Sequence, residues 1–79
     1  MEIKEIKKSI QSKFDKVTIV TSKSCLTVLD KGSLRPLFTA QMLYNGHFYI
    51  TFYIKPCSFS KMVCDMFNEL GTTFYVKEQ

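Results

Sequence analysis

Residues 37–54, LFTAQMLYNGHFYITFYI, decide the fold, because two alternating runs flank the dipeptide Asn45-Gly46. Such a pair between alternating runs is a strong signal for a β-hairpin. A two-residue turn would divide the apolar side chains between both faces of the hairpin. A shift of one residue, through a three-residue loop or a bulge, gathers them on one face, so burial selects the shifted register. That face then holds Phe38, Ala40, Met42, Tyr44, Phe48, Ile50, Phe52 and Ile54.

The opposite face of the same hairpin is polar and aromatic. It collects Thr39, Gln41, Leu43, Tyr49, Thr51 and Tyr53. A sheet with one apolar and one polar face needs a covering layer on the apolar side only. We therefore expect helices behind the hairpin and an uncovered face in front of it.

Two amphipathic helices supply the covering layer. The first is predicted by a stripe at spacings of three and four: Ile3, Ile6, Ile10 and Phe14. The second carries a longer stripe: Phe59, Met62, Val63, Met66, Phe67 and Leu70. Ser58 is the expected N-cap of the second helix, and Gly71 is its expected stop.

Three further strands are predicted at residues 17–22, 25–30 and 72–76, where β-branched and alternating side chains occur. The order of elements is α-β-β-β-β-α-β over a single domain, residues 1–79. The fold class predicted is α+β: one curved antiparallel sheet with both helices on one face. The predicted core is Ile6, Ile10, Phe14, Ile50, Phe52, Met62, Val63, Met66 and Phe67.

Charge is distributed unevenly along the chain of 79 residues, whose formal net charge is +4. Residues 1–35 hold eight basic and four acidic side chains, whereas residues 36–79 hold three of each. This asymmetry favours a polyanionic partner, nucleic acid first and an acidic protein second. The alternative interpretation is a solvated, lysine-rich helix face without a binding role.

Several function classes are not expected from this sequence. The chain has no uncharged apolar stretch long enough for a membrane helix, and its first residues are too charged for a signal peptide. We therefore expect a reduced, cytoplasmic setting for the three cysteines. Neither the cysteines nor His47, taken here as a solvated loop residue, show metal-site spacing or a nucleophile–base arrangement. We expect no enzyme, no cofactor and no metal.

The polar face of the sheet is the candidate binding surface. Basic residues at its turns suit phosphates, and tyrosine and glutamine between them suit hydrogen bonds and flat contacts. The expected contacts to phosphates are Lys23, Lys31 and Arg35, and those on the floor are Gln41, Tyr49 and Tyr53. Two alternatives stay open: tyrosines that merely suit a half-buried strand, and a protein–protein patch.

The element order and some local residues resemble a known family. The local residues that carry this resemblance are the run from Leu26 to Lys31, Arg35 and Phe38, the Asn45-Gly46 turn, and the helix ending Phe67-Asn68-Glu69-Leu70-Gly71. They are similar to the C-terminal double-wing DNA-binding domain of the MotA family, the middle-promoter activators of T-even phages. The resemblance covers roughly residues 3–77.

The resemblance implies a saddle-shaped sheet on duplex DNA, with Ser22, Lys23 and Arg35 on the wings. It also implies a small phage protein in the host cytoplasm, related to transcription or host takeover. The family's activators carry an N-terminal domain that this chain lacks, so activation itself is not expected. The rival hypothesis is a phage inhibitor that contacts a host or defence protein.

Overall fold

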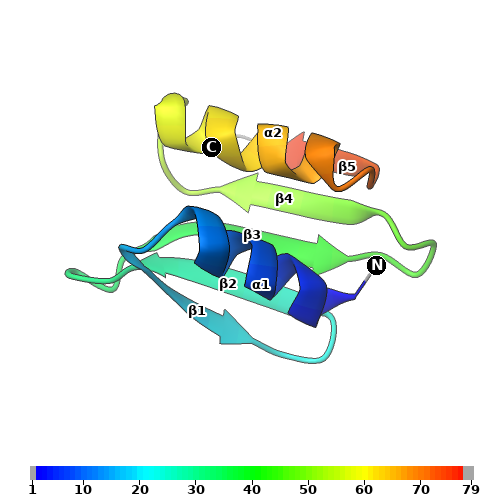
Figure 1. Ribbon diagram of the computed structural model, residues 1–79, viewed down its shortest axis with the longest axis horizontal. Coiled ribbons are helices and arrows are strands. Elements are labelled where there is room, and N and C mark those ends of the chain that lie inside the picture. Colours follow the sequence, from blue (N-terminus) through cyan, green and yellow to red (C-terminus); the bar gives the residue numbers. More distant parts are fainter. Residues whose placement is uncertain (1, 78–79) are drawn as a thin grey trace.

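The computed structural model describes residues 2–77, arranged as two helices and a five-stranded sheet (Figure 1). The chain order is α-β-β-β-β-α-β, which confirms the predicted α+β class and element order. The elements are α1 (Ile3–Lys13), β1 (Val17–Thr21), β2 (Cys25–Asp30), β3 (Pro36–Met42), β4 (Phe48–Phe52), α2 (Ser58–Glu69) and β5 (Phe74–Lys77).

Every strand pairs with its neighbour in sequence, so the sheet order is β1-β2-β3-β4-β5. The first four strands are antiparallel, but β5 runs parallel to β4. The sheet is therefore mixed, and the prediction of an antiparallel sheet is wrong for this last pair. The reason is α2, which carries the chain back along the sheet to the end where β4 began, so that the next strand starts in the same direction.

The central hairpin has the register that burial selects. Ala40 pairs with Ile50, and Met42 with Phe48. Past the strand ends the Leu43 N–H donates to the His47 carbonyl at 2.8 Å, which leaves residues 44–46 as the loop, and Gly46 there has a φ of +84° that favours glycine. Of the two expected routes to this register, a three-residue loop or a bulge, the structure has the three-residue loop. Tyr44 lies in this loop and is fully exposed, so its placement on the apolar face was wrong.

Both helices cover the same face of the sheet. Figure 1 shows α1 over β2 and β3 and α2 in front of β5, and their apolar stripes share one core with the sheet. The C-terminal end of α1 also meets α2: Lys13 forms an ion pair with Glu69 at 3.1 Å, and the ring centres of Phe14, which caps α1, and Phe59 lie 4.9 Å apart. The buried side chains are Ile3, Ile6, Ile10, Leu26, Val28, Phe38, Ala40, Phe48, Ile50, Phe52, Val63, Met66 and Phe67.

The predicted core is confirmed except at two positions. Phe14 is half-buried at the edge of the core, where it packs on Phe59. Met62 is 47% exposed, so its assignment to the core is wrong. At 100° per residue, Met62 lies at the margin of a stripe centred on Val63 and Met66, and the sheet does not reach it.

Local features set the two ends of α2. Its N-cap is Cys57 rather than the predicted Ser58, and the Cys57 N–H donates to the Ser60 hydroxyl at 2.9 Å. Gly71 follows the helix with a φ of +72°, which confirms the predicted stop. Neither α1 nor α2 is long and apolar enough to cross a membrane, within the residues described.

Candidate nucleic-acid interface

The side of the sheet that faces away from both helices is hereafter called the open face. Because side chains alternate along a strand, it carries the residues between the buried ones of β3 and β4. Gln41 pairs directly with Tyr49, and both side chains are exposed. Thr39 pairs with Thr51 in the next row. The structure therefore brings Gln41 and Tyr49 together as the sequence predicted.

Tyr53 lies just beyond β4, and its backbone N–H donates to the Leu37 carbonyl at 3.0 Å. Its side chain is 42% exposed, against 37% for Tyr49. The two tyrosines thus stand four residues apart along one line of chain, both available to a partner. Tyr53 is therefore exposed just past the end of β4, whereas Gln41 and Tyr49 lie within the paired strands of the open face.

Strand β5 adds a tyrosine that the sequence analysis did not include. In the parallel register Tyr75 lies beside Tyr49, and Tyr75 is 47% exposed. Lys77 lies beside Thr51 in the same way and adds a cation to the floor. Alternation along residues 72–76 could have placed Tyr75 on a sheet face, but the direction of β5 was needed to set it beside Tyr49.

His47 is anchored rather than loosely solvated, which corrects the sequence-based interpretation. Its Nδ1 lies 2.9 Å from the Tyr75 hydroxyl and 3.3 Å from the Asn45 side-chain nitrogen. Its backbone N–H donates to the Asn45 side-chain oxygen at 3.0 Å. The hairpin loop is therefore tied across β4 to β5, and this bond holds the Tyr75 ring in place.

The three predicted phosphate contacts are exposed and lie at opposite ends of the sheet. Lys23 is in the turn between β1 and β2, whereas Lys31 and Arg35 are in the connection between β2 and β3. Strand β2 has six residues, so these two turns are about 20 Å apart. The open face lies between two cationic ends rather than inside a continuous basic rim.

The connection between β2 and β3 is held by Asp30. Its carboxylate accepts hydrogen bonds from the Ser33 backbone N–H at 2.9 Å and the Ser33 hydroxyl at 3.0 Å. These bonds, with a weaker one from the Gly32 N–H, hold the pKa of Asp30 below its usual value. The Asp30 N–H also donates to the Arg35 carbonyl at 2.8 Å, so the segment that presents Lys31 and Arg35 has a fixed path.

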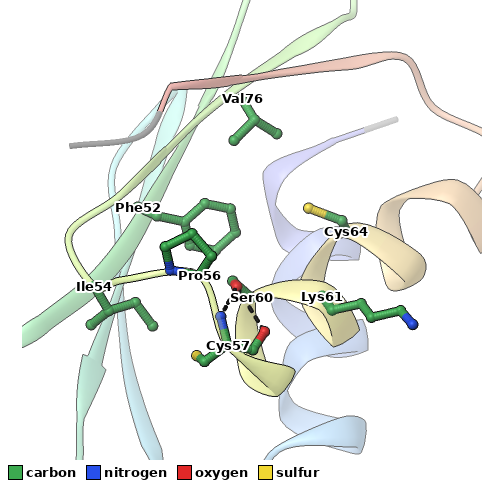
Figure 2. A pocket seen from close by; sticks show the side chains of 8 residues that line it. All are labelled: Phe52, Ile54, Pro56, Cys57, Ser60, Lys61, Cys64 and Val76. Carbon is green, nitrogen blue, oxygen red and sulfur yellow. Dashed lines mark hydrogen bonds between the residues drawn. The ribbon is translucent and has the colours of Figure 1, made fainter.

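A separate hollow lies on the helix side of the sheet (Figure 2). It has a volume of about 290 Å³ and lies between Phe52, Val76 and the start of α2. Cys57 lines this hollow and is exposed, and the Ser60 N–H holds the pKa of its thiol below its usual value. Cys64 lies two helical turns further on, about 10 Å along the axis, which is too far for a disulfide with Cys57.

Metal ligands do not gather in the described part of the chain. Within residues 2–77, no three histidine, cysteine, aspartate or glutamate side chains are placed to hold one ion. The side chains that the structure brings together on the open face are tyrosine, glutamine, threonine and lysine. These groups can donate hydrogen bonds and offer flat surfaces to a partner.

No protein-family model matches the chain, and no curated protein or solved structure shows significant similarity to it. The resemblance to the double-wing domain therefore depends on the residues and element order already given. It stays a prediction.

Proposed function

We propose that the protein binds duplex DNA across the open face and acts by binding rather than by catalysis. The observation that carries this proposal is a sheet face that neither helix covers, with exposed tyrosines and Gln41 between two cationic ends. The net charge of +4 favours a polyanion, and lysine and arginine are the usual phosphate contacts.

The spacing of the cationic ends suits a duplex. About 20 Å along one strand direction corresponds to roughly six base pairs of helix axis. Lys23 at one end and Arg35 at the other could then contact phosphates separated by about half a helical turn. Gln41, Tyr49 and Tyr75 between them would contact sugars and phosphates through hydroxyl and amide groups. Because most such contacts carry no sequence information, we expect weak sequence preference.

The biological role proposed is that of a small phage factor in transcription or host takeover, working in the host cytoplasm. This part depends on the resemblance to the double-wing family. A second candidate is an inhibitor that contacts a host or defence protein. The specific observation in its favour is the Tyr49–Tyr75 pair, since tyrosine is enriched at protein–protein interfaces.

The test is a mobility-shift assay on a double variant, Lys31→Glu with Arg35→Glu, at about 50 mM salt. Both residues belong to one cationic end of the open face and are exposed. We expect the shift of a 20-base-pair duplex to disappear, because two phosphate contacts become repulsive. The circular dichroism spectrum should not change, since exposed charge substitutions cost little stability.

The matched control is Lys8→Glu with Lys61→Glu, which makes the same change in net charge. Both lysines are exposed on the helices, which cover the side of the sheet opposite to the open face. An equal loss of binding in both double variants would show that the loss comes from the change in net charge alone. The open face would then be rejected as the binding surface. If wild-type protein shifts no duplex at low salt, DNA binding is rejected and the protein-contact candidate replaces it.

A further inference from the structure

A groove of about 430 Å³ lies between the N-terminal half of α1 and the turn that joins β1 to β2. Its two sides come from elements that are distant in sequence. Lys4 and Lys7 stand on the helix side, and Lys23 with Thr21 stands on the turn side. Met42 lines it from the end of β3. The fold thus brings the cation predicted for the open face next to two cations of the first helix.

Local structure holds both sides of this groove. Lys4 and Lys7 are three residues apart on α1 and so share one side of the helix. Opposite them, the Ser22 N–H donates to the Cys25 carbonyl at 2.8 Å, which closes the turn. The Met42 N–H donates to the Ser24 carbonyl at 2.7 Å and ties the same turn to β3. The three ammonium groups are therefore carried by ordered backbone.

The charge balance of the groove is positive. Glu2 is the carboxylate that lines it, and at the start of α1 the Glu2 N–H donates to the Glu5 side chain at 3.1 Å. Within residues 2–77, the ion pair that forms is Lys13–Glu69, at the far end of α1. No carboxylate therefore lies within ion-pair distance of Lys4, Lys7 or Lys23 in this part of the chain. Three cations against one carboxylate leave a net charge of about +2.

We propose that this groove binds a backbone phosphate of the duplex, so that the DNA contact continues from the open face around the turn between β1 and β2. The inference depends on the proposed function. A lysine ammonium is a compact point charge that binds phosphate without fixed geometry, and three of them can converge on one phosphate group. The Lys23 side chain lines the groove, and its turn lies at the end of the sheet, so a duplex on the open face can reach the groove around this turn.

The experiment compares Lys4→Gln/Lys7→Gln with Lys8→Gln/Lys61→Gln, which removes the same charge elsewhere. The affinity for a fluorescein-labelled 20-base-pair duplex of mixed sequence is measured by anisotropy between 50 and 200 mM KCl. One lost phosphate contact lowers the slope of log affinity against log salt by about 0.9 and weakens binding roughly tenfold near 0.1 M. We expect this for the groove variant and less than about a twofold change for the control.

The outcomes separate the inference from the proposed function. If wild type binds and the two double variants behave alike, the groove holds no phosphate and the open face remains the contact. If wild type binds no duplex, both proposals are rejected. A second measurement guards against damage to α1: when unlabelled duplex is added to wild type, the backbone amide signals of Thr21 and Ser22 should shift. Signals that stay in place would overturn the inference.

Discussion

The two faces of β4 differ although their residues alternate along five positions of one strand. Phe48, Ile50 and Phe52 are at most 3% exposed, whereas Tyr49 between them is 37% exposed. The buried side chains pack on α1, α2 and each other, and Phe48 lies 5.6 Å from Phe67 between ring centres. Tyr49 instead lies beside Gln41 and Tyr75 on the neighbouring strands, on the face that neither helix covers. One strand thus serves stability on one side and leaves the other side available for binding.

This division explains why the open face can be polar without loss of stability. Thirteen apolar side chains are buried on the helix side, which is the source of most of the folding free energy. Among the described residues, no polar or charged residue is buried. Substitutions on the two faces should therefore separate cleanly into effects on unfolding and effects on binding.

The strongest test of this division is Phe52→Ala. Phe52 is 3% exposed and its ring lies 5.6 Å from that of Phe38. Removing a buried phenylalanine leaves a cavity and should lower the free energy of unfolding by about 3–5 kcal/mol. Urea unfolding measures this loss. The neighbouring Tyr53→Ala, on an exposed side chain, should change stability by less than about 0.5 kcal/mol. A loss below about 1 kcal/mol for Phe52→Ala would show that the face assignment of β4 is wrong.

A second test uses cysteines that lie on different sides of the sheet. Cys25 pairs with Gln41 on the open face and is half-buried, while Cys57 is exposed at the start of α2. Bound duplex should slow the alkylation of Cys25 by iodoacetamide several-fold and leave that of Cys57 unchanged. Mass spectrometry of the peptides gives both rates in one sample.

The same alkylation reaction also has a pH dependence. The Ser60 N–H lowers the pKa of Cys57, so its thiolate forms at a lower pH than that of an ordinary cysteine, whose pKa is about 8.5. Its alkylation rate should therefore reach half of its maximum below that pH. Protection of Cys57 by duplex, with Cys25 unaffected, would place the contact on the helix side and contradict the division between the faces.

The smallest effect is expected at the cationic end that holds Lys31 and Arg35. Because the pKa of Asp30 is lowered in the folded state, its bonds stabilise the fold above the unfolded pKa. They are lost as the pH falls through the folded value. Ser33→Ala removes the hydroxyl bond but keeps the stronger bond from the Ser33 N–H. The pKa of Asp30, measured by an NMR titration, should then rise part of the way toward the ordinary aspartate value of about 3.9. An unchanged midpoint would mean that the hydroxyl does not contact the carboxylate in solution.

Much of the fold could be predicted because the deciding signals are local. Alternation around Asn45-Gly46 sets the hairpin register, and Gly71 marks the end of α2. The direction of β5 could not be predicted in this way, since it depends on the end of the sheet at which α2 finishes. Met62 was misplaced because a stripe of six residues is wider than the surface that the sheet offers.

The candidate site was predictable only as far as strand alternation reaches. Gln41 and Tyr49 follow from the hairpin alone. Tyr75 required the parallel register, and the bond between His47 and Tyr75 joins residues 28 positions apart. Lys23 lines the same groove as Lys4 and Lys7 because of how α1 packs on the sheet, and no local sequence pattern predicts that packing.

The sheet order has a consequence for the route by which the chain folds. Met42 and Phe48 are paired across only six positions of sequence, while Phe48 and Phe74 are 26 positions apart. The loss of conformational entropy on closing the longer loop costs about 1.3 kcal/mol more, because each doubling of loop length adds roughly 0.6 kcal/mol. The four-stranded meander can therefore assemble from short-range contacts before β5 docks. Since β5 holds four residues at the edge of the sheet, its amides should exchange hydrogen soonest among the strands.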